Sequence, residues 1–179
     1  DADFMCCDIS DYYLGTPMER SEYMRIHRRQ ISATIIAELD LEQYFCEDIL
    51  HFEVEKGMYG LPQAGLLAQE RLVGHLAQHG YIQSDTVPCL FCHATNGITF
   101  VLVVDDFGIK FKGAEGRDHL LSTLRLLYKI TVDDEGSQYL GMAIKHDKTA
   151  QTITISMPGY IAKVIARFHA LLAGTSTAR

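Results

Sequence analysis

The sequence predicts an α+β fold, with one antiparallel sheet and helices packed on one face of it. Two observations predict this class. Short apolar runs of strand length alternate along the chain with longer stretches whose apolar residues recur at helical spacing. Several of the short runs are joined by tight-turn residues, and a tight turn pairs its two flanking strands antiparallel. Paired strands interleaved with helices are typical of α+β domains.

The first half of the chain is predicted to hold a buried strand, a mixed region and a long helix. Gly15-Thr16-Pro17 breaks a helical turn predicted at residues 11–14, because glycine and proline both interrupt helices. Pro62 suits the first turn of a helix, where its missing N–H is not needed, and Gly80 suits the position just past a helix end. The predicted elements are strands at residues 4–9, 22–26 and 51–55, one or two helices between residues 31 and 50, and a helix at 62–79.

The second half is predicted to hold two hairpins and two helices. Asn96-Gly97 lies between two apolar runs, which is the strongest short-range signal for a hairpin. Pro158 lies near the start of the last apolar stretch and suits the first turn of a helix. The predicted elements are strands at 89–93, 98–104 and 107–112, a helix at 118–128, strands at 139–145 and 152–156, and a helix at 157–172. We predict one domain over residues 1–173 and a polar tail over 174–179.

Composition limits the function classes. The 179 residues contain 16 Lys and Arg against 23 Asp and Glu, a formal net charge of −7, and this balance alone argues against a basic nucleic-acid binder. No apolar stretch reaches the roughly 18 residues that a membrane span needs. Five cysteines form no small disulfide scaffold, so a reduced, intracellular setting is the simplest interpretation. The chain begins without Met, and we expect it to be a fragment of a longer protein.

The pair Asp105-Asp106 is the strongest chemical signal. Four apolar strand residues run directly into these two carboxylates, and another apolar strand follows. Ionised carboxylates beside an apolar hairpin repel each other and lose hydration, and a divalent cation would offset both costs. Hard oxygen ligands of this type suit Mg²⁺ or Mn²⁺. The competing interpretation is a solvated Asp-Asp turn without a ligand.

Asp8 strengthens the metal hypothesis. It also ends a short apolar strand, so its carboxylate would meet the other two if the two strands are neighbours in one sheet. Three carboxylates could then hold two metal ions about 3.5–4 Å apart, the arrangement that serves in-line phosphoryl or nucleotidyl transfer. The residues alone do not establish that the strands are neighbours.

A series of motifs along the chain resembles, in order, the motifs of one family. The matching segments are Asp8 to Gly15, Glu22 to Arg25, Lys56 to Ala64, Pro88 to Phe91, Val103 to Asp106, Tyr139 to Met142 and Pro158 to Ile161. On these residues the chain resembles the reverse transcriptase domain of LTR retrotransposon polyproteins, closest to the copia-like elements. The resemblance covers nearly the whole chain. It implies a polymerase palm-like sheet, with fingers and thumb largely absent, and RNA-directed DNA polymerase activity.

The resemblance implies catalytic residues and metal ligands among the matching residues. Asp8, Asp105 and Asp106 would be the catalytic triad that binds two Mg²⁺ ions, with Mn²⁺ as an alternative. Ile9, next to Asp8, is counted with the metal ligands and with the nucleotide-binding residues. The reaction would transfer a nucleotide from a dNTP to a primer 3′-OH by a two-metal mechanism.

The resemblance also implies residues that bind the nucleotide or the template. Tyr13, five residues after Asp8, would lie under the sugar of the incoming nucleotide, where its ring clashes with a 2′-OH. Gln63 would contact the nucleotide or the template through its amide, and its neighbour Pro62 is placed in the same group. The implied partners are an RNA or DNA template with primer, dNTPs, and the rest of the polyprotein, including ribonuclease H and integrase. The implied location is cytoplasmic particles and the nucleus.

Some residues depart from the family pattern. Val103-Val104 stands where Tyr-Val or Tyr-Met more often precedes the aspartate pair, so an aromatic contact to the primer end would be missing. The basic fingers region that grips the triphosphate would lie upstream of Asp8. Two other hypotheses therefore stay open. One is a truncated or degenerate palm that acts as a nucleic-acid or protein interaction module, and the other is a different two-metal palm such as a nucleotide cyclase.

Two weaker signals have plain alternatives. Cys89 and Cys92 form a C-x-x-C, but a zinc site needs four ligands and no second pair exists, so free thiols in a core are favoured. His27-Arg28-Arg29, with Arg25 nearby, is the one compact basic cluster of the sequence. It could meet a phosphate backbone or be an ordinary solvated surface.

Overall fold

The computed structural model describes residues 2–175 and divides the chain into two compact units. Unit 1 combines Asp1–Ser10 with Leu76–Arg179, and unit 2 is Asp11–His75. The predicted domain over residues 1–173 therefore spans both units, and its bounds stay a prediction. The predicted polar tail begins inside the last helix, which ends at Thr175, and residues 176–179 lie outside the described residues.

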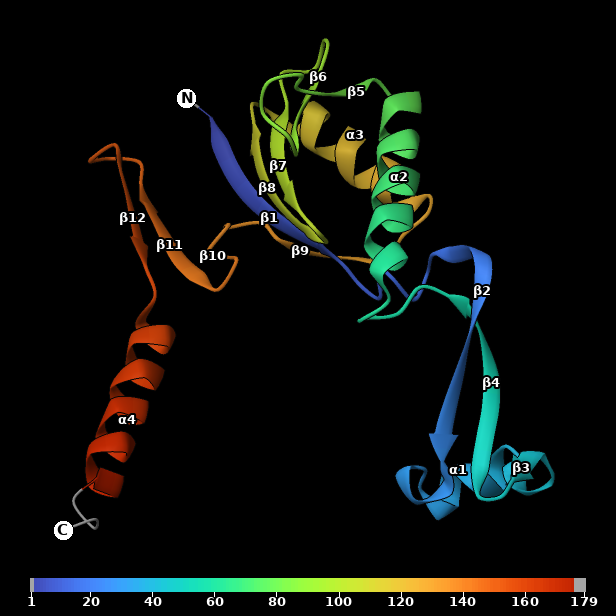
Figure 1. The fold of residues 1–179 in the computed structure, drawn as a ribbon. Coiled ribbons are helices and arrows are strands. Elements are labelled where there is room, and N and C mark those ends of the chain that lie inside the picture. Colours follow the sequence, from blue (N-terminus) through green and yellow to red (C-terminus); the bar gives the residue numbers. More distant parts are fainter. Residues whose placement is uncertain (1, 176–179) are drawn as a thin grey trace. The chain divides into compact units, whose positions relative to one another are not determined.

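Unit 1 is built on a six-stranded antiparallel sheet with the strand order β5-β6-β7-β8-β1-β9 (Figure 1). The first strand of the chain lies inside this sheet, paired with β8 on one side and β9 on the other. The sheet therefore joins the start of the chain to segments beyond residue 100. The strands are β1 (Asp3–Ile9), β5 (Tyr81–Gln83), β6 (Leu90–His93), β7 (Thr99–Val103), β8 (Asp106–Phe111) and β9 (Ile130–Asp133).

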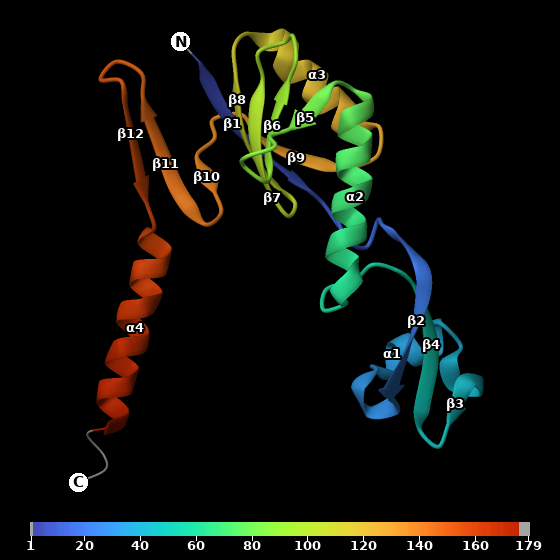
Figure 2. The same cartoon turned by 45° about the horizontal axis from the view of Figure 1, so that its top comes forward.

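One face of the six-stranded sheet carries the core of unit 1. Successive strand residues point to opposite faces, and on β8 Phe107 and Ile109 are fully buried whereas Asp106 is only half-buried. The helix α3 (Ala114–Arg125) lies beside the six-stranded sheet (Figure 2). It contacts β8 and buries an apolar stripe at helical spacing. That stripe consists of Leu120, Leu121 and Leu124. The side chain of Asp106 therefore lies on the face opposite this core.

The rest of unit 1 is a smaller sheet followed by a helix. The order of the smaller sheet is β10-β11-β12, and all its pairs are antiparallel. Its strands are β10 (Gln138–Tyr139), β11 (Met142–Asp147) and β12 (Thr152–Ser156). The last helix, α4 (Pro158–Thr175), begins one residue after and ends three residues after the bounds predicted from the sequence, 157–172.

Unit 2 is a long two-stranded ribbon with short helices at one end (Figure 1). The ribbon pairs β2 (Pro17–His27) with β4 (Ile49–Lys56), and the short β3 (Phe45–Cys46) adds to β4. The chain between β2 and β3 forms η1 (Arg28–Gln30), α1 (Ala33–Glu38) and η2 (Leu41–Tyr44). The helix α2 (Pro62–Gln78) starts in unit 2 at Pro62, as predicted, and is followed by Gly80 with a φ of 85°.

The α+β class and the antiparallel pairing are confirmed, but the strands form three sheets instead of one. The two smaller sheets consist of strands that are close in sequence and pair only with each other. Hairpin signals predict such local pairs, but they do not say which hairpins share an edge. The predicted helix at 118–128 is α3 at Ala114–Arg125, and the short strands β3, β5, β9 and β10 were not predicted as separate elements.

Candidate active site

The aspartate pair lies at a tight turn between two strands of the six-stranded sheet. Val103 at the end of β7 pairs with Asp106 at the start of β8, so only Val104 and Asp105 form the loop. Val104 has a φ of 62°. A β-branched residue rarely adopts this left-handed conformation, which costs of order 1–3 kcal/mol and is found mostly at functional sites. The turn thus presents both carboxylates at a strained part of the backbone.

Asp8 is brought to this turn by the pairing of β1 with β8. Asp8 is the direct partner of Asp106 in the antiparallel ladder. The backbone N–H of Ile9 donates a hydrogen bond of 3.1 Å to the carbonyl oxygen of Asp105. Partners in an antiparallel pair point to the same face of a sheet. The neighbour of β1 is thus β8, the strand that follows the aspartate pair, and not β7, the strand that leads into it. Three carboxylates from distant segments lie at one end of β1 and β8.

The surroundings of Asp8 and Asp106 disfavour their ionised forms. Burial raises the pKa of Asp8, and the charges of Asp105 and Asp106 raise it further. Burial likewise raises the pKa of Asp106, with the charge of Asp105 as the second cause. Each shift means that the ionised form is disfavoured where it stands. A cation bound between these groups would reverse that penalty.

The donor set suits a hard divalent cation, although the structure presents no ready-made metal cage. Between residues 2 and 175, no group of three or more His, Cys, Asp or Glu side chains is arranged so that it could hold a metal ion. Carboxylate oxygens under mutual repulsion are nevertheless the ligands that Mg²⁺ and Mn²⁺ prefer. The Ile9 side chain is apolar and 1% exposed. Ile9 could therefore serve as a ligand only through its backbone carbonyl.

Tyr13, Pro62 and Gln63 belong to unit 2 and are described within it. The ring of Tyr13 is half-buried and meets the ring of Tyr59 edge to face, with centroids 4.9 Å apart. The side-chain Nε2 of Gln63 donates a hydrogen bond of 2.7 Å to Oε1 of Glu22. Pro62 is exposed at the first position of α2. The nucleotide- and template-binding roles of these residues stay predictions.

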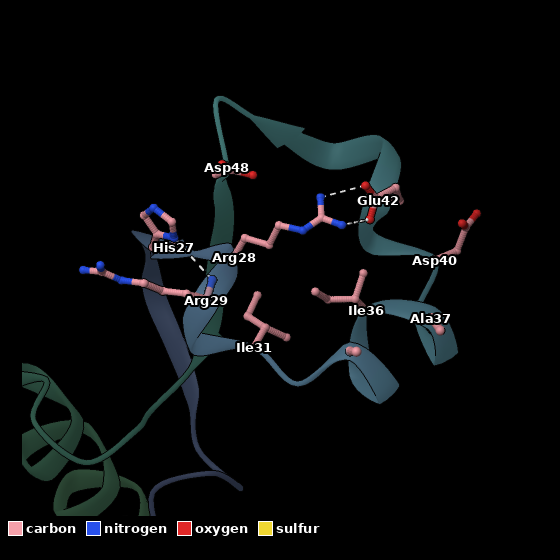
Figure 3. Close-up of a pocket in the computed structure, with 10 residues that line it drawn as sticks. His27, Arg28, Arg29, Ile31, Ile36, Ala37, Asp40, Glu42 and Asp48 are labelled. Atoms are coloured by element: carbon pink, nitrogen blue, oxygen red, sulfur yellow. Dashed lines mark hydrogen bonds and ion pairs between the residues drawn. The ribbon is translucent and has the colours of Figure 1, made fainter.

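The basic cluster of the sequence lines a hollow of about 720 Å³ in unit 2 (Figure 3). The guanidinium of Arg28 makes two hydrogen bonds of 2.7 and 2.6 Å to the carboxylate of Glu42 and lies over the ring of Phe45. The His27 side chain accepts a hydrogen bond from the backbone of Arg29. The charge of Arg28 is thus already paired, which leaves the exposed side chain of Arg29 as the better phosphate contact of the cluster.

Tyr139 is a residue near the site that motif reading alone did not assign. Its ring packs on Gly108 of β8, where an added Cβ would lie 3.1 Å from the ring. Its hydroxyl donates a hydrogen bond of 3.4 Å to the carbonyl oxygen of Val101. Burial raises the pKa of Tyr139, and the charge of Asp106 adds to the shift. Gly108 is the sequence signal for this contact, because glycine inside a strand often marks a close approach.

The two cysteines of the C-x-x-C differ in exposure. Cys89 is half-buried and Cys92 is exposed, so the expectation that both are core thiols is wrong for Cys92. On β6, Cys92 follows the buried Phe91 and points to the opposite face of the sheet, which explains its exposure. Among the helices that the structure describes, none is both long enough and apolar enough to cross a membrane.

Comparison with known proteins gives a consistent result. The family model described as "Reverse transcriptase (RNA-dependent DNA polymerase)" matches residues 19–178. A curated protein of Saccharomyces cerevisiae, named "Putative transposon Ty5-1 protein YCL074W", is 30% identical over 114 residues. The match covers 63% of this chain and 37% of that protein, so the chain spans well under half of the relative's length. No solved structure gives a significant match.

Proposed function

We propose that this chain, which belongs to the reverse transcriptase (RNA-dependent DNA polymerase) family, catalyses RNA-directed DNA synthesis as part of a retrotransposon polyprotein. The similarity to a protein named for a transposon supports the second part of this proposal. The closer assignment to copia-like elements rests on the sequence motifs alone. The substrates would be dNTPs and a primer paired to an RNA or DNA template.

The observation that carries the proposal is the pairing of Asp8 with Asp106 beside Asp105. At one end of a sheet, burial and neighbouring aspartate charges raise the pKa of Asp8 and of Asp106, and such carboxylates are costly to keep for stability alone. Perturbed carboxylates that gather in this way are typical of catalytic sites. Bound cations would neutralise the negative charge of the carboxylates and so remove this electrostatic cost.

The residues divide into two roles. Asp8, Asp105 and Asp106, with the carbonyl of Ile9, would hold two Mg²⁺ ions, or Mn²⁺ in their place. Such ions, when bound, lower the pKa of the primer hydroxyl and stabilise the leaving pyrophosphate. By holding that positive charge in place, the three carboxylates would position the reacting phosphate.

The second role is substrate selection. Tyr13 would lie against the sugar and exclude a 2′-OH. Gln63 would hydrogen-bond the nucleotide or template through the amide oxygen that Glu22 leaves available, with Pro62 fixing the start of the helix that carries it. Ribonuclease H and integrase segments of the same polyprotein, in cytoplasmic particles and the nucleus, would complete the setting.

Primer extension tests the proposal directly. The chain, or a longer piece of the polyprotein, is incubated with an RNA template, a DNA primer, dNTPs and Mg²⁺. We expect Asp105→Asn to reduce extension by at least about 100-fold, because the variant keeps the shape of the side chain but loses a metal-ligating charge. Asp85→Asn, at an exposed loop position, is the matched control and should leave extension unchanged. No extension by the wild-type chain in either form would refute the proposal.

One observation favours the alternative of a non-catalytic palm that acts as an interaction module. The described residues offer no preformed group of three metal-ligating side chains. Mn²⁺ titration by calorimetry separates the two functions. A polymerase palm should bind Mn²⁺ and lose that binding in Asp8→Ala, whereas an inert module should bind no Mn²⁺ in either form.

A further inference from the structure

We propose that Tyr59 is a positioning residue for Tyr13 and that it helps to set the preference for deoxynucleotides. The inference rests on the proposed function, in which the ring of Tyr13 meets the sugar of the incoming nucleotide. The two rings are in edge-to-face contact, with centroids 4.9 Å apart and an interplanar angle of 74°. This is a preferred geometry for an aromatic pair.

The backbone of Tyr13 is held from one side by the loop that carries Tyr59. An added Cβ on Gly57 would lie only 2.8 Å from the carbonyl oxygen of Tyr13. Only glycine therefore allows the loop to approach this closely. The same carbonyl oxygen accepts a hydrogen bond of 2.9 Å from the backbone N–H of Thr16. The main chain beneath the Tyr13 ring is thus fixed, and the remaining freedom is in the side chain.

The Tyr13 side chain has a buried ring, a helix backbone and an exposed ring as its three neighbours. The ring of the buried Tyr12 lies 5.5 Å away between centroids. At Gly65 on α2, an added Cβ would lie 3.7 Å from the Tyr13 hydroxyl, so the helix backbone sits just beneath that group. The third neighbour, Tyr59, is 64% exposed and belongs to the loop between Gly57 and Gly60. Tyr59 is therefore the neighbour whose loss would most readily free the ring.

A ring excludes a 2′-OH only while it stays in the place where the hydroxyl would be. Edge-to-face pairs favour the paired arrangement by about 2- to 10-fold over the unpaired one. Losing Tyr59 should therefore let the Tyr13 ring leave its place more often and admit ribonucleotides. The substrate class that responds is the rNTP, and incorporation of dNTPs should change little.

The test measures kcat/KM for a dNTP and for the matching rNTP in primer extension. In Tyr59→Leu we expect the ratio of dNTP to rNTP incorporation to fall by about 2- to 10-fold. Tyr59→Phe keeps the ring and should retain the wild-type ratio. Tyr44→Leu is the matched control, because Tyr44 is similarly exposed at 62% in the same unit, and it should not change the ratio. An unchanged ratio in Tyr59→Leu would overturn the positioning role.

A second readout separates this inference from the proposed function. NMR of protein labelled at its tyrosine rings reports the contact without any turnover. We expect the Tyr13 ring signals to shift in Tyr59→Leu and to stay near their wild-type positions in Tyr44→Leu. Unmoved Tyr13 signals in Tyr59→Leu would refute the positioning role even in an inactive chain. Absence of extension together with a Tyr13 shift would refute only the polymerase function.

Discussion

At the scale of single residues, the proposed site consists of carboxylates, two of which lie in an environment that opposes their charge. Asp8 shows this most clearly, because burial and the two neighbouring aspartates all raise its pKa above 3.8. A carboxyl group with a raised folded pKa keeps its proton to higher pH in the folded state than in the unfolded state. Its contribution to stability is therefore present at low pH and is lost as pH rises from 3.8 through the folded pKa.

We expect Asp8→Asn to stabilise the metal-free protein at pH 7, because the variant removes a charge that the fold disfavours. The free energy of unfolding, measured in urea, should rise relative to wild type at pH 7. The difference should shrink as the pH is lowered toward 4, where wild-type Asp8 regains its proton. Addition of Mg²⁺ should raise the melting temperature of the wild type more than that of Asp8→Asn. A destabilised variant at pH 7, or equal responses to Mg²⁺, would contradict the electrostatic account.

Glu22 should matter to nucleotide binding through its hydrogen bond to Gln63. In Glu22→Ala the Gln63 side chain regains rotational freedom, which binding must then remove. We expect the KM for dNTPs to rise by about 2- to 10-fold, with a smaller effect on kcat. Steady-state primer extension measures both values.

The controls for this experiment lie in the same ribbon. Glu22→Gln can still accept the hydrogen bond and should restore most of the affinity. Glu55→Ala removes an exposed carboxylate from β4 and should leave the KM unchanged. If Glu22→Ala and Glu55→Ala behave alike, Glu22 does not position Gln63.

At the scale of elements, the turn between β7 and β8 stores backbone strain beside the carboxylates. Val104 adopts a φ of 62°, which suits glycine far better than a β-branched residue. We expect Val104→Gly to raise the free energy of unfolding by about 0.5–1 kcal/mol, the relieved strain less the entropy that glycine loses on folding. Urea denaturation measures the change.

Val103 provides the matched control for the turn. It occupies a regular strand position next to Val104 and pairs with Asp106. Val103→Gly should lower the free energy of unfolding by about 0.5–1 kcal/mol, because glycine weakens a strand. Two substitutions of the same chemistry at adjacent positions should thus have opposite signs. Equal destabilisation by both would show that the positive φ carries no strain.

The sequence predicted the strands and helices with strong local signals and missed those that depend on distant partners. Asn96-Gly97 correctly placed the hairpin of β6 and β7, and Pro62 correctly placed the start of α2. The strand β9 has no turn signal of its own, and its backbone is held in a strand by pairing with β1. The periodicity of apolar residues does not show which distant strands will pair.

The candidate site shows the same division between local and distant information. The place of Asp8, Asp105 and Asp106 at the ends of apolar strands suggested a shared metal site, and the family motifs added their catalytic role. The pairing that joins them is a property of the sheet. The contact between Tyr139 and Gly108 was beyond prediction, since a glycine in a strand signals a close approach without naming the partner.

At the scale of the whole molecule, the chain combines the family's motifs with a net charge of −7. The predicted reverse transcriptase family is confirmed by a family match over residues 19–178. An acidic chain of this kind should bind nucleic acid weakly, through few phosphate contacts. We expect its template affinity to fall only shallowly with rising salt, and fluorescence anisotropy with a labelled primer–template measures that slope. A steep fall of affinity with salt would contradict this expectation, because it would indicate a basic binding surface despite the net negative charge.

The helix α4 exposes an apolar stripe that should make the isolated chain self-associate. Apolar side chains recur along it at helical spacing, and each is at least 47% exposed. The stripe includes Tyr160, Ile161, Val164, Ile165 and Phe168. Exposed patches of this kind promote association. We expect sedimentation velocity to show concentration-dependent association of the wild type that Ile165→Glu reduces. Ala166→Glu, one position further along the helix, adds the same charge off the stripe and should not reduce it.

The pairing of β1 with β8 also determines when, during synthesis, the site can exist. Asp8 is translated before all of unit 2, and its partner Asp106 is made only after unit 2 and a further part of unit 1 have followed. Bringing such distant segments together costs chain entropy and slows folding. Until then β1 is an unpaired strand, the type of segment that aggregates in incomplete chains. Any chain terminated before residue 106 carries Asp8 without a site, so the chemistry is reserved for products that are translated through both strands.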